Sequence, residues 1–222
     1  MANTLGRTPG AVGLKMANLA HYDPDLISRN LKGMSNGSKL DKIIFEEFYQ
    51  NLEELSCQAE EILKKLKGKE YSLIRPDIDL INIPEGESRE TTTKARIEQY
   101  FFRKTVLASY SGRCCVTGIN NQQLLVASHI KPWAESDIKT ERTNPCNGLC
   151  LNALHDKAFD RGLMTIDREY KIVLSTKLHQ MKMDEATKMW FESYDEKEIV
   201  LPDRFLPSKE FIEYHNDVIF QR

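Results

Sequence analysis

The stretch "LLVASHIKPW", residues 124–133, runs from an apolar strand pattern directly into a histidine. Leu124 to Ala127 are consecutive apolar residues, which is typical of a buried strand, and Pro132 ends the run. Histidine gains and loses a proton near neutral pH, and a strand end is a rigid place to hold one. His129 is therefore either a hydrogen-bonded core or surface residue, or a general base.

The composition predicts a globular chain. Its 222 residues are 41% hydrophobic and 29% charged, which fits one moderate domain or two small ones with a core. The net charge of −2 neither indicates nor excludes a nucleic-acid partner, because phosphate contacts need only local Lys and Arg. No stretch approaches the roughly 18 apolar residues of a membrane span, and residues 1–10 lack the apolar run of a signal peptide. We expect a cytoplasmic protein with no membrane contact.

The first part of the chain is predicted to be helical. Residues 5–20 resemble the end of a helix-turn-helix, with Thr8 as N-cap and Pro9 in the first turn. The alternative is an amphipathic helix that packs without touching DNA. A longer helical pattern runs from residue 38 to Gly68, and it is compatible with a spacer or with the seam of a homodimer.

A linker is predicted between two parts of the chain. Pro76, Pro84 and Gly86 interrupt an acidic stretch that has no helical or strand period. The predicted organisation is a helical N-terminal region over 1–75, a linker over 76–90 and a second domain over 91–222.

The second domain mixes helices and strands. A helix is predicted over 91–110, with Ile97, Phe101, Val106 and Leu107 as its apolar positions. Further along, "LMTID" (163–167) and "KIVLS" (171–175) predict a hairpin, and "LPSKEFIEYHNDVIF" (206–220) predicts a short terminal helix. The fold class is therefore α+β.

The segment "NPCNGLCLNALHDKAFDRG", residues 144–162, holds the remaining polar groups of interest. Asn147 begins a turn that leads into a short apolar strand. Asn152 is a helix N-cap, and Gly162 ends the helix that carries His155. The order along the chain is strand, histidine, loop, asparagine, short strand, helix and second histidine.

The three stretches "ASHIKPW", "NPCNGLCL" and "HDKAFDRGL" together resemble the HNH endonucleases, the His-Me finger superfamily with a ββα-metal core. The flanking segments "RIEQYFFRKTVLASYSGRCCVTGI" and "LPSKEFIEYHNDVIF" resemble those of restriction-type HNH proteins. The resemblance covers roughly residues 90–222. It implies a ββα-metal nuclease domain with an added β-hairpin and terminal helix. It also implies metal-dependent hydrolysis of DNA phosphodiesters, in restriction or antiviral defence.

The resemblance also assigns roles to individual residues. His129 would be the general base that deprotonates a water, and Asn147 would brace it. His155 would ligate a divalent ion that bridges the scissile phosphate and the leaving oxygen. Mg²⁺ is the expected ion, and a histidine ligand also suits Mn²⁺, Ni²⁺ or Zn²⁺.

One position departs from the family pattern. Many HNH nucleases carry Asp or His as a metal ligand just before the general base, and this chain has Ser128 there. Because a hydroxyl is a poor substitute for a carboxylate, another ligand is required. Asp160 is the first substitute and Asp156 the second.

Basic residues around the predicted site are expected to contact DNA phosphates. They are Arg96, Arg103, Lys131, Arg142 and Arg161. Arg161 could also stabilise charge in the transition state. A non-catalytic DNA-binding protein on an HNH scaffold is the alternative, and Ser128 favours it.

The cysteines do not form a recognisable zinc or disulfide pattern. Their number is odd, and the adjacent pair Cys114–Cys115 is poorly spaced to chelate one zinc ion. Free thiols are the simpler interpretation.

Overall fold

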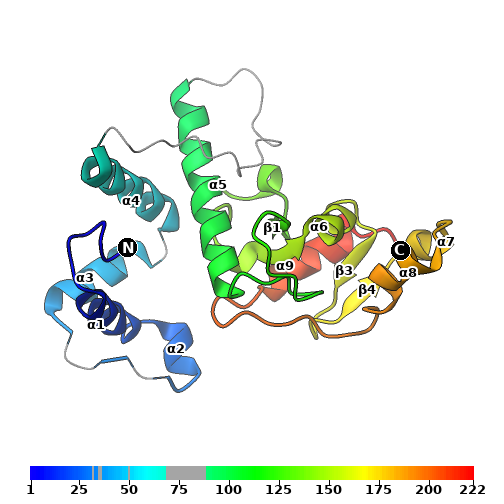
Figure 1. Cartoon of the computed structure of the whole chain (residues 1–222), viewed down its shortest axis with the longest axis horizontal. Coiled ribbons are helices and arrows are strands. Elements are labelled where there is room, and N and C mark those ends of the chain that lie inside the picture. Colours follow the sequence, from blue (N-terminus) through cyan, green and yellow to red (C-terminus); the bar gives the residue numbers. More distant parts are fainter. Residues whose placement is uncertain (32, 35–36, 50, 69–88) are drawn as a thin grey trace. The chain divides into compact units, whose positions relative to one another are not determined.

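In the computed structural model (Figure 1), the residues described are 1–31, 33–34, 37–49, 51–68 and 89–222. The chain divides into two compact units, one formed by Met1–Gln99 with Ile138–Thr143 and the other by Tyr100–Asp137 with Asn144–Arg222. Most of the predicted linker over 76–90 lies outside the described residues, so the predicted domain boundary stays a prediction. Within the described ranges, no helix has the length and apolar character that crossing a bilayer requires.

The first unit is built from helices. They are α1 (Pro9–Ala20), α2 (Pro24–Ser28), α3 (Lys39–Phe48), α4 (Leu52–Lys67) and the first part of α5 (Arg89–Ser109). Thr8 caps α1 by accepting a hydrogen bond from the Ala11 amide, as its sequence predicted. The single long helix predicted from residue 38 to Gly68 was wrong. The chain forms α3 and α4 instead, because Asn51 adopts a non-helical conformation and caps a new helix through the Glu54 amide.

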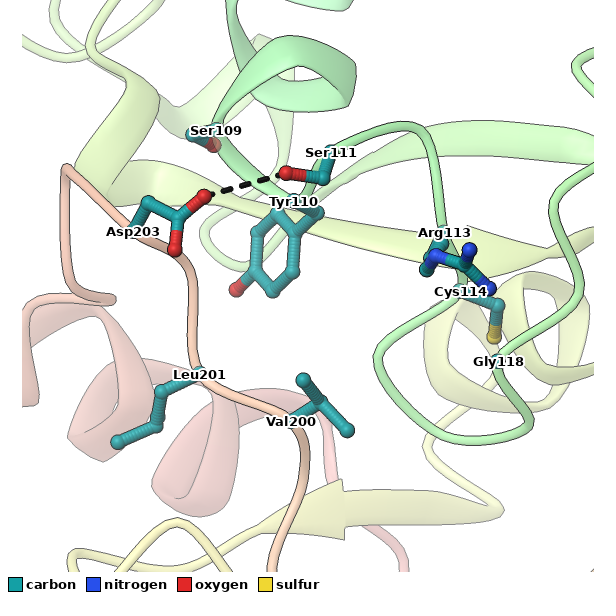
Figure 2. Close-up of a pocket in the computed structure, with 9 residues that line it drawn as sticks. All are labelled: Ser109, Tyr110, Ser111, Arg113, Cys114, Gly118, Val200, Leu201 and Asp203. Carbon is teal, nitrogen blue, oxygen red and sulfur yellow. Dashed lines mark hydrogen bonds between the residues drawn. The ribbon is translucent and has the colours of Figure 1, made fainter.

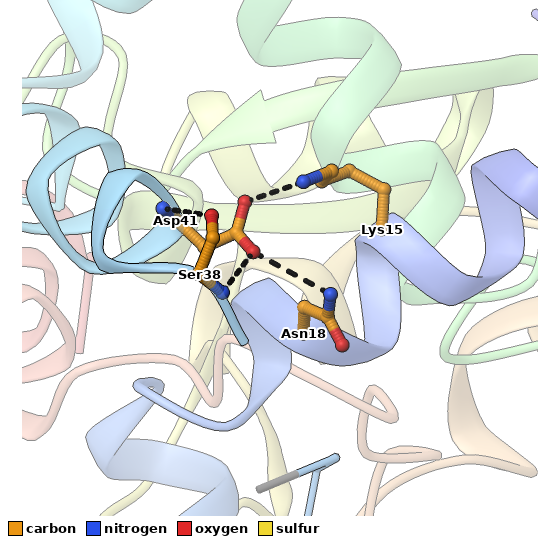
Figure 3. A network of polar contacts seen from close by, with 4 residues as sticks. All are labelled: Lys15, Asn18, Ser38 and Asp41. Carbon is orange, nitrogen blue, oxygen red and sulfur yellow. Dashed lines mark hydrogen bonds and ion pairs between the residues drawn. The ribbon is translucent and has the colours of Figure 1, made fainter. Parts of the chain in front are cut away.

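A buried carboxylate joins α1 to α3 (Figure 3). Asp41 is 4% exposed and accepts hydrogen bonds from Lys15 Nζ at 2.7 Å and from the Ser38 amide at 2.9 Å. Asn18 Nδ2 donates at 3.4 Å to Oδ2, the same oxygen that accepts from the Ser38 amide. The bond from Lys15 is the main reason that the pKa of Asp41 lies below its usual range. The contacts hold the N-terminus of α3 against α1.

The second unit contains a ββα arrangement. Strand β1 (Leu125–His129) pairs antiparallel with β2 (Gly148–Asn152), and α6 (Ala153–Asp160) follows β2 directly and packs against both strands. The register places His129 opposite Gly148. Asn152 caps α6, because its side-chain oxygen accepts from the amides of Leu154 and His155. The predicted strand, turn and helix are confirmed here, and the fold is α+β.

Shorter elements complete this unit. The predicted hairpin is formed by β3 (Met164–Ile166) and β4 (Ile172–Leu174), and the predicted terminal helix is α9 (Lys209–Tyr214), which continues as a π-helical turn, η4 (His215–Ile219). The remaining elements are η2 (Trp133–Glu135), η3 (Pro145–Asn147), α7 (Thr176–Gln180) and α8 (Glu185–Glu192).

The core of this unit lies between α5, the β1–β2 hairpin, α6 and the β3–β4 hairpin. On α5, the side chains in this core are Phe102 and Val106, four residues apart on one helical face. The predicted positions Val106 and Leu107 are confirmed as part of this core or packed against it, whereas the predicted Phe101 is only half-buried and its neighbour Phe102 is buried instead.

All five cysteines are free thiols. Cys114, Cys115 and Cys150 are buried in the core. Burial raises the pKa of the Cys150 thiol to about 12 and raises that of Cys115 well above its usual value. These two groups are therefore protonated at neutral pH and pack as small apolar side chains.

Candidate active site

His129 ends β1 with its ring half-buried between two aromatic side chains. The ring stacks on Phe102 with a centroid distance of 3.7 Å and an angle of 14° between the planes. The ring of Trp133 lies nearly perpendicular to the imidazole, with a centroid distance of 5.5 Å and an angle of 84° between the planes. The ring is therefore fixed in its plane by side chains that are themselves buried, at 2% exposure for Phe102 and 7% for Trp133.

Asn147 is completely buried and holds the main chain that follows His129. Its Oδ1 accepts from the Lys131 amide at 2.8 Å, and its Nδ2 donates to the Lys131 carbonyl at 3.1 Å and to Ser136 Oγ at 3.2 Å. Its own carbonyl accepts from the Ile130 amide at 3.0 Å. A short side chain with one acceptor and one NH₂ group satisfies three partners at once, which explains why an asparagine stands here. These bonds hold Ile130 and Lys131, the two residues that directly follow His129.

Local sequence delivers Asn147 to this position. Pro145 starts the turn η3, and Asn144 caps it by accepting from the Cys146 amide at 3.0 Å. From the other side, Ser136 Oγ lies within hydrogen-bond distance of the carbonyls of Lys131 and Pro132, at 3.0 and 2.9 Å. The loop after β1 is thus closed on itself by short-range bonds.

His155 lies in the core, 1% exposed, on the first turn of α6. Its Nε2 is 2.8 Å from the carbonyl oxygen of Trp190, which can only accept, so we assign the ring proton to Nε2. Its Nδ1 is 2.8 Å from Asn152 Nδ2 and accepts from that amide. Burial lowers the pKa of His155, in keeping with a neutral ring. With both nitrogens engaged, the ring as placed offers no lone pair to a metal ion.

The other predicted metal ligands are not assembled around His155. Asp160 is exposed at the end of α6, five residues on, which is roughly 140° around the helix at 3.6 residues per turn. Asp156 is half-buried on the same helix. Ser128 is 2% exposed, and its hydroxyl has no hydrogen-bond partner among the described residues. In those same parts of the chain, no group of three or more His, Cys, Asp or Glu side chains is arranged to hold a metal ion.

The predicted DNA-contacting residues divide between the two units. Arg96 and Arg142 belong to the first unit, where each is half-buried. Arg103 donates to the carbonyls of Leu125 at 2.8 Å and Gln122 at 3.1 Å, so its guanidinium ties α5 to the start of β1.

Two further basic residues lie near the ββα core. Lys131 places its ammonium 5.4 Å from the centre of the Tyr214 ring. Arg161 is exposed directly after α6. Contact with DNA stays a prediction for these residues and for the three arginines above.

A separate surface pocket of about 140 Å³ lies near the end of α5 (Figure 2). Ser111 Oγ donates to Asp203 Oδ2 at 3.1 Å at this pocket, which Tyr110 and Val200 also line. None of the predicted site residues contributes to it.

Sequence reasoning missed the aromatic and hydroxyl partners of the site. Phe102 contacts His129 and Ser136 contacts Asn147, yet neither was predicted as a site residue. Phe102 carried no signal of this contact, because an apolar residue in a helix is ordinarily core.

Comparison with known proteins agrees with this geometry. Residues 114–167 match the family model described as HNH endonuclease, and this span contains β1, the loop, β2, α6 and β3. The second unit therefore contains an HNH endonuclease domain. The expected resemblance is confirmed for these residues.

A solved structure described as "Modification dependent TagI restriction endonuclease" is also similar to part of the chain, with a TM-score of 0.33 and 22% sequence identity. The similarity covers 52% of this chain and 36% of that one, so this chain spans little more than a third of the length of that protein. No curated protein matches the sequence.

Proposed function

We propose that this protein is a divalent-metal-dependent endonuclease that hydrolyses phosphodiester bonds of DNA, with His129 as general base. The observation that carries the proposal is the half-exposed His129 ring at the end of β1, inside the span that matches the HNH family. A general base must reach water, and it works best when its ring is held in one orientation. Phe102 and the loop closed by Asn147 supply that rigidity.

In the proposed reaction, a ring nitrogen of His129 takes a proton from a water molecule as the water oxygen bonds to the phosphorus. The bond from the phosphorus to the leaving oxygen breaks, and that oxygen takes up a proton from solvent. Asn147 keeps the following main chain in place, so that the ring does not move away from the water. HNH nucleases generally use a divalent metal ion, which when bound would neutralise charge on the phosphate and on the leaving oxygen.

The donors for that ion do not fit it as they are placed, because the nitrogens of His155 are engaged and Asp160 is exposed elsewhere on α6. His155 and Asp160 therefore stay predicted ligands, and we assign no step to the ion. Mg²⁺ is the ion we propose, with Mn²⁺, Ni²⁺ or Zn²⁺ as alternatives.

The remaining parts of the proposal rest on the sequence, and of these only the role in defence rests on the family resemblance. They are a role in restriction or antiviral defence, phosphate contacts by the five basic residues, a cytoplasmic location and a homodimer seam in the N-terminal region. The logarithm of the DNA-binding constant falls linearly with the logarithm of the salt concentration, and removing one phosphate contact should make that slope less steep by about one.

A non-catalytic DNA-binding protein is the second candidate. The engaged nitrogens of His155 and the buried hydroxyl of Ser128 favour it, because both positions are ones where HNH nucleases would need metal donors. The half-exposed His129 favours catalysis, since a scaffold kept only for binding has no use for a base.

The test is plasmid cleavage by the purified chain with Mg²⁺ or Mn²⁺, beside EDTA and the variant His129→Ala. His179→Ala is the matched control, because it removes an exposed histidine on α7. We expect metal-dependent nicking or linearisation that EDTA and His129→Ala abolish and the control retains. Cleavage that survives in His129→Ala would refute the assigned base. DNA binding without cleavage, on methylated and unmethylated plasmid alike, would establish the second candidate instead.

A further inference from the structure

Two phenylalanine–histidine stacks of nearly identical geometry occur in the second unit. Phe102 and His129 are 3.7 Å apart with an angle of 14° between their planes, and Phe159 and His215 are 3.8 Å apart with an angle of 16°. The second stack belongs to the core, since His215 is 1% exposed and bonds to Thr165 Oγ1 and to the Phe159 carbonyl. In the first stack, the histidine is half-exposed while the phenylalanine beneath it is buried.

The position of the Phe102 ring is restrained by α5 and by the core around it. The next residue, Arg103, donates to the carbonyls of Leu125 and Gln122, so α5 cannot slide along β1 without breaking both bonds. Phe102 is also 2% exposed within a packed core, which leaves its side chain little rotational freedom.

Gly148 lets Phe102 come this close to the hairpin. It lies directly opposite His129 in the strand register. A methyl group on Gly148 would lie 2.5 Å from Val106 Cγ2 and 2.9 Å from Phe102 Cζ, both far shorter than van der Waals contact. The absence of a side chain at this position therefore creates the space in which the phenyl ring supports the histidine.

We propose that Phe102 is a positioning residue for His129. Its ring fixes the plane of the imidazole, Trp133 packs nearly perpendicular to the imidazole, and Gly148 admits the phenyl ring. This inference rests on the proposed function, because positioning matters only if His129 acts as a base. A reacting group displaced by about 1 Å loses on the order of 100-fold in rate, so a flat surface beneath the base has a direct consequence for catalysis.

The experiment compares Phe102→Leu with Phe159→Leu. Both changes remove a buried phenyl ring that stacks on a histidine, but only the first stack contains the proposed base. The readouts are the single-turnover cleavage rate, the DNA concentration that gives half-maximal rate, and the NMR shifts of the His129 ring protons, assigned with His129→Gln. The assay temperature is one at which circular dichroism shows all variants folded.

We expect Phe102→Leu to lower the cleavage rate by about 10- to 100-fold with the half-saturating DNA concentration changed less than about 2-fold. The His129 ring protons should also move downfield, because they lose the shielding of the phenyl face. Phe159→Leu should change neither the cleavage rate nor the shifts of the His129 ring protons. If Phe102→Leu does not fold, Phe102→Met with Phe159→Met as control also removes the aromatic face, and the unbranched methionine side chain can adapt to the space that the phenyl ring leaves.

Equal cleavage rates for the two variants would overturn the positioning role while leaving the nuclease intact. Unshielded His129 protons in the unmodified protein would overturn it as well. A chain that cleaves no DNA in any form would refute the proposed function, and the positioning role with it.

Discussion

Lowering the pH from 7.5 to 5 is expected to destabilise the second unit through His215. This histidine is 1% exposed and stacks on Phe159, and its Nε2 is 3.1 Å from the Phe159 carbonyl. Burial lowers the pKa of His215 from 6.5 to about 4. The unfolded chain takes up a proton as the pH falls below 6.5, whereas the folded chain does so only near 4. The contribution of His215 to the free energy of unfolding is therefore fully present above pH 6.5 and is lost progressively as the pH falls toward 4.

The size of the effect follows from the two pKa values. A shift from 6.5 to about 4 corresponds to about 3 kcal/mol in full, of which about 2 kcal/mol is lost between pH 7.5 and pH 5. Burial also lowers the pKa of His155, so that residue adds a loss of stability of the same sign as the pH falls below 6.5.

The assay is guanidinium-induced unfolding at pH 5 to 7.5, followed by tryptophan fluorescence. Both tryptophans, Trp133 and Trp190, belong to the second unit, so the signal reports on that unit. The variant His215→Gln keeps an amide that can donate to the Phe159 carbonyl but has no titrating group. It should lose clearly less stability on acidification than the unmodified chain, while His179→Gln, an exposed control, should not differ from it. If His215→Gln loses as much unfolding free energy between pH 7.5 and pH 5 as the unmodified chain, His215 is not the cause of the acid sensitivity.

Three further substitutions have expected outcomes. Asn147→Ala should lower the free energy of unfolding by about 2–4 kcal/mol and abolish cleavage, because it removes the acceptor of the part-buried Lys131 amide and the donor to the Lys131 carbonyl and Ser136 Oγ; denaturant unfolding and plasmid cleavage check both. Gly162→Ala should lower the melting temperature, because Gly162 has φ of +65° and a methyl group there would lie 2.1 Å from the carbonyl oxygen of Ile219; an unchanged melting temperature would contradict the described turn. Arg161→Ala, at an exposed position, should change stability by less than about 0.5 kcal/mol yet weaken DNA binding and lower its salt slope by about one, as fluorescence anisotropy would show.

The ends of several elements could be read from short-range chemistry. Thr8 caps α1, and Asn152 caps α6, because a side-chain oxygen can bond to amides two or three residues ahead in the same chain. Gly162 ends α6 for an equally local reason, since its positive φ is unfavourable for other residues. For the same reason the ββα unit could be predicted, since its strand, turn and helix follow one another between residues 125 and 160.

Interruptions and helical faces were predicted less well. The helix expected across residues 38–68 is divided at Asn51, since a cap competes with continuation and periodicity alone does not decide between them. On α5, Phe101 and Phe102 are adjacent and both apolar, and only the position of the β1–β2 hairpin decides that Phe102 is the buried one. Apolar residues on adjacent helical positions point about 100° apart, so a small rotation of the helix exchanges them.

By itself, the sequence determined the order of the ββα unit, its caps and the histidine at the end of β1, because these depend on neighbours within a few residues. Only the tertiary structure decided what surrounds the two histidines of the motif. The Nε2 of His155 meets the Trp190 carbonyl, which comes from α8, 35 residues further along the chain. The ring of His129 meets Phe102 on α5, which precedes it in the sequence. Such contacts depend on how distant segments pack against one another, and that packing minimises the free energy of the whole unit rather than that of any one stretch.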